Sequence, residues 1–352
     1  MAGPEQEGIE ESMSFTKIAP IGVSCARSWS FLLIVSALAV SSQAQTCLTS
    51  EDMDVGTRTS LQNTAKQYFD LAAKGDVASL RQNAIPGVAA DFGGIEAAVR
   101  DHQETFAGAQ ATPRAPFLLT AEGNKPLERA EFLCGVFGKS GQTANSAVFV
   151  LPNLPPGEYA VVILDVAGKA PSTLSFVLQR LGNTWKLGGF YARSSQLAGH
   201  DGQWLLEHAR EFKAKGQKRN AWFYYMAARE QLAPVPFMST LTTDRLYDES
   251  QALRPTDLPE GGNTVDLVAG GRTYKLTAAF AVGVGNELDL VVKYSAADIS
   301  NTNLTYQENV NVIRALTAKF PELRDGFTAI IARAVEASGR DYGTMLAVKD
   351  IK

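Results

Sequence analysis

The chain has 352 residues, 45% of them hydrophobic and 20% charged, and a formal net charge of −4 at pH 7. This weak charge excludes a protein built to bind polyanions, since nucleic-acid binders carry basic stripes or clusters. The densest basic stretch, Lys213 to Arg219, is typical of a solvated helix end. The length predicts two domains or three.

The first feature along the chain is the apolar run Phe31 to Val40, which predicts a secretion signal. Arg27 precedes it, and Ser42-Gln43-Ala44 supplies the small residues that signal peptidase requires. The run reaches only about half-way across a hydrocarbon core. We therefore expect a signal peptide at 1–44, a mature protein that begins at Gln45 in the periplasm or outside the cell, and no transmembrane segment.

Two details of this leader leave alternatives. The residues before Met13 include four glutamates, whereas a signal peptide opens with basic residues, so Met13 rather than Met1 is a candidate start. Cys47 follows the apolar run closely enough to suggest a lipid anchor. Thr46 stands where a lipoprotein signal needs Gly, Ala or Ser, and this disfavours the anchor.

The mature chain keeps two cysteines, Cys47 and Cys134. An even pair in an oxidising compartment can form a disulfide. Alternatively, Cys134 is a small buried hydrophobic residue. The sequence alone does not decide between these interpretations.

Residues 54–195 show a change of period from helix to strand. Leu61, Ala65, Tyr68, Phe69 and Ala72 predict a helix over Thr59 to Gln82, interrupted at Lys74-Gly75-Asp76, and a second helix fits Gly94 to Phe106. Five strand patterns rich in Val, Leu, Phe and Tyr then follow at 131–137, 147–151, 158–166, 173–181 and 184–192. Helices followed by a meander predict an α+β layer in which a curled sheet wraps around the helices.

Two segments carry a family resemblance. Tyr68-Phe69, Ala72, Gly75-Asp76 and Leu80 resemble the opening helix-turn-helix of the NTF2-like (SnoaL-type) superfamily, and Leu178 to Leu187 resembles its closing hairpin. The resemblance implies a cone-shaped pocket between sheet and helices. Some members perform isomerisation or dehydration there, others bind ligands, and many only mediate contacts.

Where such enzymes act, an Asp or His in the cone abstracts a proton. Asp91, Asp101 and His102 lie nearby in the sequence, and none aligns with a family catalytic position, so we assign no catalytic residue. The candidates for lining a pocket are Tyr68, His102, Trp185 and Tyr191. Alternation places Trp185, Leu187 and Tyr191 on one face, either lining the cone or packed as core, and core is the favoured interpretation.

Residues 201–233 read as two helices joined by Lys215-Gly216-Gln217 and resemble a single tetratricopeptide repeat. One repeat cannot bury both of its faces, so we expect it to pack on a flanking domain rather than form a partner-binding groove. A Pro- and Gly-containing linker is predicted at 234–262.

The last unit, residues 263–352, is predicted to be a small α+β domain of the form β-β-α-β-β. Its expected elements are strands at 272–282 and 287–294, a helix at 306–319, and strands at 327–337 and 344–350. We recognise no family in it.

Motifs that would name a reaction are missing. Gly138-Lys139-Ser140 lacks the earlier glycine of a phosphate-binding loop, the three histidines show no zinc spacing, and no Gly-x-Ser-x-Gly occurs. We therefore expect no cofactor and no metal. The favoured hypothesis is an exported, non-catalytic ligand- or protein-binding protein of the bacterial envelope. The alternative is an NTF2-like enzyme that performs proton transfer on a small apolar molecule.

Overall fold

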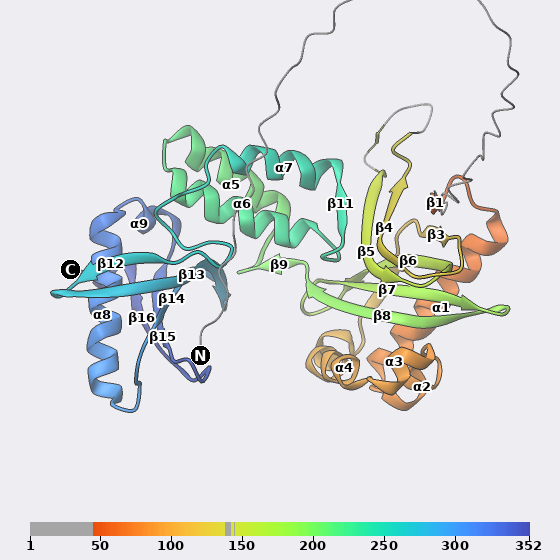
Figure 1. Cartoon of the computed structure of the whole chain (residues 1–352), viewed down its shortest axis with the longest axis horizontal. Coiled ribbons are helices and arrows are strands. Elements are labelled where there is room, and N and C mark those ends of the chain that lie inside the picture. Colours follow the sequence, from red (N-terminus) through yellow and green to blue (C-terminus); the bar gives the residue numbers. More distant parts are fainter. Residues whose placement is uncertain (1–44, 138–141, 144) are drawn as a thin grey trace, which may run out of the picture. The chain divides into compact units, whose positions relative to one another are not determined.

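The structure is a computed structural model that describes residues 45–137, 142–143 and 145–352. The predicted signal peptide, residues 1–44, lies outside the described residues. Figure 1 shows helices together with largely antiparallel sheets, so the predicted α+β class is confirmed. The predicted domain boundaries stay predictions.

Four helices open the described chain after a short strand. They are α1 (Val55–Ala73), α2 (Val77–Gln82), α3 (Pro86–Ala90) and α4 (Gly93–Phe106). Asp54 caps α1, because its carboxylate accepts a hydrogen bond from the amide of Thr57. Gly75 follows α1 with a φ of 69°, a conformation that glycine adopts without strain. The predicted interruption at 74–76 therefore separates two helices, and α3 is an addition to the prediction.

A six-stranded antiparallel sheet packs on these helices. Its strands are β1 (Gln45–Leu48), β2 (Gln110–Pro113), β3 (Phe117–Ala121), β6 (Gly157–Ala167), β7 (Ser172–Leu181) and β8 (Thr184–Ser194). The order is β1-β3-β6-β7-β8, and β2 also pairs with β6. Leu61 and Phe106 of the helices share one core with Val162 and Phe176 of the sheet.

A second sheet covers the opposite face of the first. It contains β4 (Leu127–Cys134), β5 (Ala147–Leu154) and β11 (Met238–Thr240), in the order β11-β5-β4. Phe132 and Phe149 pack there against Val161 and Ile163 of β6. The predicted single meander is therefore wrong for β4 and β5. Strand β6 is apolar on both faces, because it separates two cores.

The segment 195–262 connects these sheets to the C-terminal unit. A tiny hairpin of β9 (Gln196–Leu197) and β10 (His200–Asp201) leads into α5 (Gly202–Ala214) and α6 (Lys218–Leu232). The predicted linker at 234–262 contains β11 and a further helix, α7 (Leu241–Gln251), so describing all of it as a linker was wrong. Glu249 anchors α7 to α5 and α6, because its carboxylate accepts hydrogen bonds from Arg210 and Tyr225.

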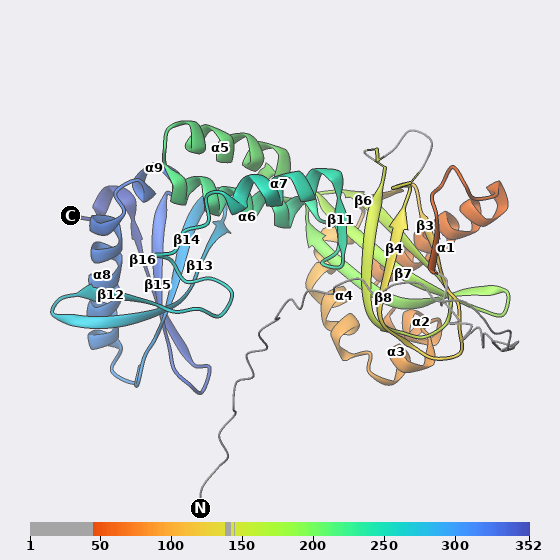
Figure 2. The ribbon, with the colours of Figure 1, turned by 45° about the horizontal axis from the view of Figure 1, so that its top comes forward.

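The C-terminal unit is a five-stranded sheet with helices on one face, as Figure 2 shows for α8. Its elements are β12 (Val265–Ala269), β13 (Arg272–Val284), β14 (Glu287–Ser295), α8 (Thr302–Lys319), α9 (Leu323–Gly326), β15 (Ala329–Val335), β16 (Asp341–Ala347) and a 3₁₀ turn, Val348–Asp350. The strands follow chain order, and β14 and β15 are parallel because α8 crosses between them. Strand β12 was not predicted.

Helix α6 shares its core with this sheet. Phe223 packs edge to face on Phe327, and the Tyr224 hydroxyl donates a hydrogen bond of 2.7 Å to the main-chain oxygen of Gly326. Leu205, Ala228, Leu290 and Ile330 belong to one buried cluster. The helical pair thus packs on a flanking unit, the arrangement that the sequence favoured over a free groove.

Candidate functional site

Tyr68 and Trp185, two of the predicted pocket residues, are neighbours. Tyr68 is buried in α1, and its hydroxyl donates a 2.9 Å hydrogen bond to the main-chain oxygen of Trp185 in β8. Burial raises the pKa of Tyr68 to about 12. This hydroxyl therefore stays protonated at neutral pH and serves to hold helix against strand.

The side chain of Trp185 is only half-buried, whereas its neighbour Leu187 is fully buried. Trp185 lies one residue from the start of β8, next to the turn that carries Gly182, and its cross-strand partner is Arg180. The Arg180 guanidinium lies 5.9 Å from the centre of the indole ring. The indole packs against the core between the helices and the sheet from its edge, because the end of the strand lies there.

Tyr191 lies on the opposite face from Leu187, so the predicted shared face is wrong. The register pairs Leu178 with Leu187 but Val177 with Gly189, which leaves Gly188 as an extra residue in a β-bulge. One extra residue inverts the alternation beyond it. Tyr191 therefore points toward the second sheet, where its ring centre lies 5.2 Å from that of Phe237. The pair Gly188-Gly189 inside a strand was the sequence signal for this bulge.

His102 is not joined to Tyr68 or Trp185. It is half-buried on α4, its Nδ1 lies 2.9 Å from the main-chain oxygen of Ala98, and its ring stacks on Phe106. Asp91 and Asp101 are exposed. Of the four predicted pocket residues, the structure thus brings together only Tyr68 and Trp185. His102 and Tyr191 lie on other surfaces.

Aromatic rings pack against one another between the helices and the large sheet. Phe69 meets Phe106, and Phe176 meets both Tyr68 and Phe190, with ring centres 5.6 to 5.9 Å apart in edge-to-face contacts. In the described part of the chain, Asp289 is the only buried carboxylate or imidazole, and it lies in β14 of the C-terminal sheet. This core therefore offers no buried base for proton transfer.

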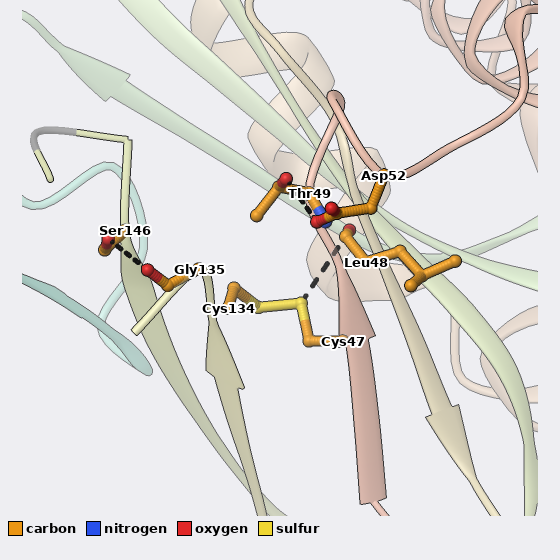
Figure 3. Close-up of a disulfide and its surroundings, with 7 residues drawn as sticks. All are labelled: Cys47, Leu48, Thr49, Asp52, Cys134, Gly135 and Ser146. Carbon is orange, nitrogen blue, oxygen red and sulfur yellow. Dashed lines mark hydrogen bonds between the residues drawn. A yellow bond between two sulfur atoms is a disulfide. The ribbon is translucent and has the colours of Figure 1, made fainter. Parts of the chain in front are cut away.

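A disulfide joins the two N-terminal sheets at one corner. Figure 3 shows Cys47 of β1 bonded to Cys134 of β4, and their α-carbons are 5.1 Å apart. Beyond the disulfide, the Ser146 hydroxyl donates a 2.8 Å hydrogen bond to the main-chain oxygen of Gly135. The β4–β5 hairpin is thus fixed at its loop end by a covalent bond.

The outer face of this hairpin combines apolar and charged side chains, since the exposed Arg129 and Glu131 lie on it and Glu131 is the cross-strand partner of Val150. Leu133 and its cross-strand partner Val148 lie beside Val150, on the side away from the buried Phe132 and Phe149. Leu133 is 40% exposed, and Phe137, beyond the end of β4, is 84% exposed. Sequence analysis identified a strand at 131–137 but assigned neither of its faces to solvent, and so it missed this surface. The motif Gly138-Lys139-Ser140 lies outside the described residues.

Within the described residues, no cluster of three potential metal ligands occurs, and no helix is long and apolar enough to span a bilayer. His200 and His208 stack on either side of Trp204, with ring centres 3.6 Å from that of the indole.

Comparison of the chain with protein-family models, curated proteins and solved structures found no match.

Proposed function

We propose that this chain is an exported, non-catalytic protein of the bacterial envelope that binds a protein partner at its surface. The observation that carries the proposal is the aromatic packing between helices and sheet, where the described residues include no buried carboxylate or imidazole, because a proton-transfer enzyme needs an open site with a titratable group. Export to the periplasm or beyond is supported by the leader sequence and by a disulfide, which is rare in reducing compartments.

We also propose an NTF2-like domain over residues 54–195. The support is the order of elements, with α1 to α4 before a curled sheet whose last two strands form the hairpin at Gly182. The second sheet, β11-β5-β4, is a departure from that simple layer. The aromatic contacts between the helices and the large sheet favour surface contacts, rather than a cone, as the mode of action for this domain.

The partner is proposed to bind the outer face of the β4–β5 hairpin. Leu133, Val148 and Val150 form a short apolar strip there beside Glu131, and the exposed Phe137 follows the end of the strand. Exposed apolar strips of this kind are typical of protein-binding surfaces, where aromatic residues serve as anchors. The disulfide at Cys134 would limit the entropy lost when the hairpin binds.

The test combines native mass spectrometry with one variant pair. Protein purified from its own envelope should retain a partner protein, and Leu133→Asp should abolish that complex. Val55→Asp, at an exposed apolar residue of α1, is the matched control and should leave the complex intact. Retention of a small molecule by the wild type, or equal behaviour of both variants, would overturn the proposal.

A further inference from the structure

The C-terminal sheet presents an apolar row on the face that its helices do not cover. Phe280 pairs with Val291, Val291 with Ile331, and Ile331 with Met345, so four strands contribute one side chain each. The alternate residues Leu290, Val292, Ile330 and Ala332 belong to the helix-covered core. Phe280 and Met345, at the two ends of the row, remain 40% and 55% exposed, whereas Ile331 is half-buried and Val291 is only 5% exposed.

Charge changes sign across this row. Successive residues of a strand point to opposite faces, so Glu287, Asp289, Val291 and Lys293 of β14 share the uncovered face. Glu287 and Asp289 lie on one side of the row, and Lys293 lies on the other. Asp289 and Lys293 are equally far from Val291, about 7 Å along the strand in each direction.

Asp289 is incompletely compensated within its own chain. Its side chain is buried, and its Oδ1 accepts one hydrogen bond, 2.9 Å from the amide of Ala329. Lys293, by contrast, lies 5.6 Å from the centre of the Phe280 ring, at the edge of the apolar row. A nearby cation stabilises the ionised form of a buried carboxylate. Lys293 is such a cation, and it lies on the other side of the same row.

We propose that this face binds a second copy of the chain. A two-fold axis along the apolar row would place each of its four side chains opposite its own copy. The same axis reverses the strand direction, so Lys293 of each copy would lie opposite Asp289 of the other. The face is therefore self-complementary in both apolarity and charge, which a face suited to an unrelated partner need not be.

The size of the face sets the expected affinity. Five strands about 4.8 Å apart and about seven residues long present a flat area on the order of 500 Å². This is below the roughly 800 Å² per partner of a standard interface, so we expect a weak dimer. The inference concerns a different surface from the β4–β5 hairpin and does not depend on the proposed function.

Sedimentation velocity of the purified mature protein between about 1 and 200 µM tests the inference. The wild type should pass from monomer to dimer in this range. Met345→Asp should weaken association at least about tenfold, because a charge would be buried in the interface without a partner. Leu304→Asp, on the exposed side of α8, is the matched control and should dimerise like the wild type.

Cross-linking gives a second readout that needs no change of charge. Met345→Cys should cross-link to itself with a bismaleimide spacer of about 10 Å, the distance between packed sheets, whereas Leu304→Cys should not. A wild type that stays monomeric at 200 µM would overturn the inference. So would a dimer that Met345→Asp leaves unchanged, or a cross-link from Met345→Cys to a different envelope protein in place of a second copy.

Discussion

The hydroxyl of Tyr68 donates a hydrogen bond of 2.9 Å to the main-chain oxygen of Trp185, and this bond joins α1 to β8. Both residues were candidates for lining a pocket, although core packing was the favoured interpretation for Trp185. The Tyr68 ring instead packs edge to face on Phe176, inside a closed core. Replacing a residue that supports the packing in this way should lower the free energy of unfolding. Any loss of binding should follow from that loss of stability.

The aromatic core predicts a contrast between two substitutions. Phe176→Ala removes a fully buried ring and should lower the free energy of unfolding by about 3 to 5 kcal/mol. Trp185→Ala, at a half-buried ring, should cost about half as much, because less apolar area is lost. Urea denaturation followed by circular dichroism measures both values. Equal losses would show that Trp185 is as deeply packed as Phe176.

The sequence predicted the longer helices other than α7, and the longest strands, because their apolar periods are clear. Leu61, Ala65, Tyr68, Phe69 and Ala72 are all buried on α1, as their spacing required. Strands β1, β2, β3 and β12 escaped prediction because each is only four or five residues long, too short for alternation to stand out. The separation of β4 and β5 into a second sheet depends on long-range pairing with β11, which no local pattern encodes.

The disulfide predicts a large loss of stability on its removal. Cys47 and Cys134 are 87 positions apart, and closing a loop of that length should stabilise the fold by about 4 kcal/mol through the entropy of the unfolded chain. Cys47→Ser is the variant to use, because Cys47 is half-exposed while Cys134 is fully buried. A lower urea midpoint with an unchanged native spectrum is expected. An unchanged midpoint would mean that the covalent link adds nothing.

A glycine in β13 predicts a steric effect. A β-carbon at Gly283 would lie 2.8 Å from the main-chain nitrogen of Ala198, which cannot move as a side chain could. Gly283→Ala should therefore destabilise the protein by about 1 to 3 kcal/mol. Gly94→Ala, where a β-carbon meets no atom within 4 Å, is the control and should be neutral or slightly stabilising in α4. Thermal unfolding of the two variants measures the difference.

The candidate site was less predictable than the fold, and the reason is local. One bulge at Gly188 turned Tyr191 from the helix side to the second sheet, which separated it from Trp185 and Leu187. The apolar row of the C-terminal sheet was hidden because β14 and β15 are apolar on both faces. Periodicity then indicates burial without saying which face a helix covers.

Asp289 predicts an unusual dependence of stability on pH. Burial raises the pKa of this carboxyl group, and the hydrogen bond from the Ala329 amide offsets part of that effect. The neutral form is thus favoured in the folded state. Its contribution to stability is fully present below the unfolded pKa of about 3.9 and is lost as the pH rises through the folded pKa.

Asp289→Asn should therefore raise the free energy of unfolding at pH 7, and the gain should shrink toward pH 3, where the wild-type carboxyl is already protonated.

Asp341 is the matched control with the opposite sign, because the Arg333 guanidinium lowers the pKa of that carboxyl group. Its contribution is present above about 3.9 and is lost as the pH falls through the folded pKa, so Asp341→Asn should destabilise at pH 7. Urea titrations should be made near 1 µM, where Lys293 of a second copy cannot compensate Asp289. A loss of stability in Asp289→Asn at pH 7 would mean that groups of the same chain already stabilise the ionised carboxylate.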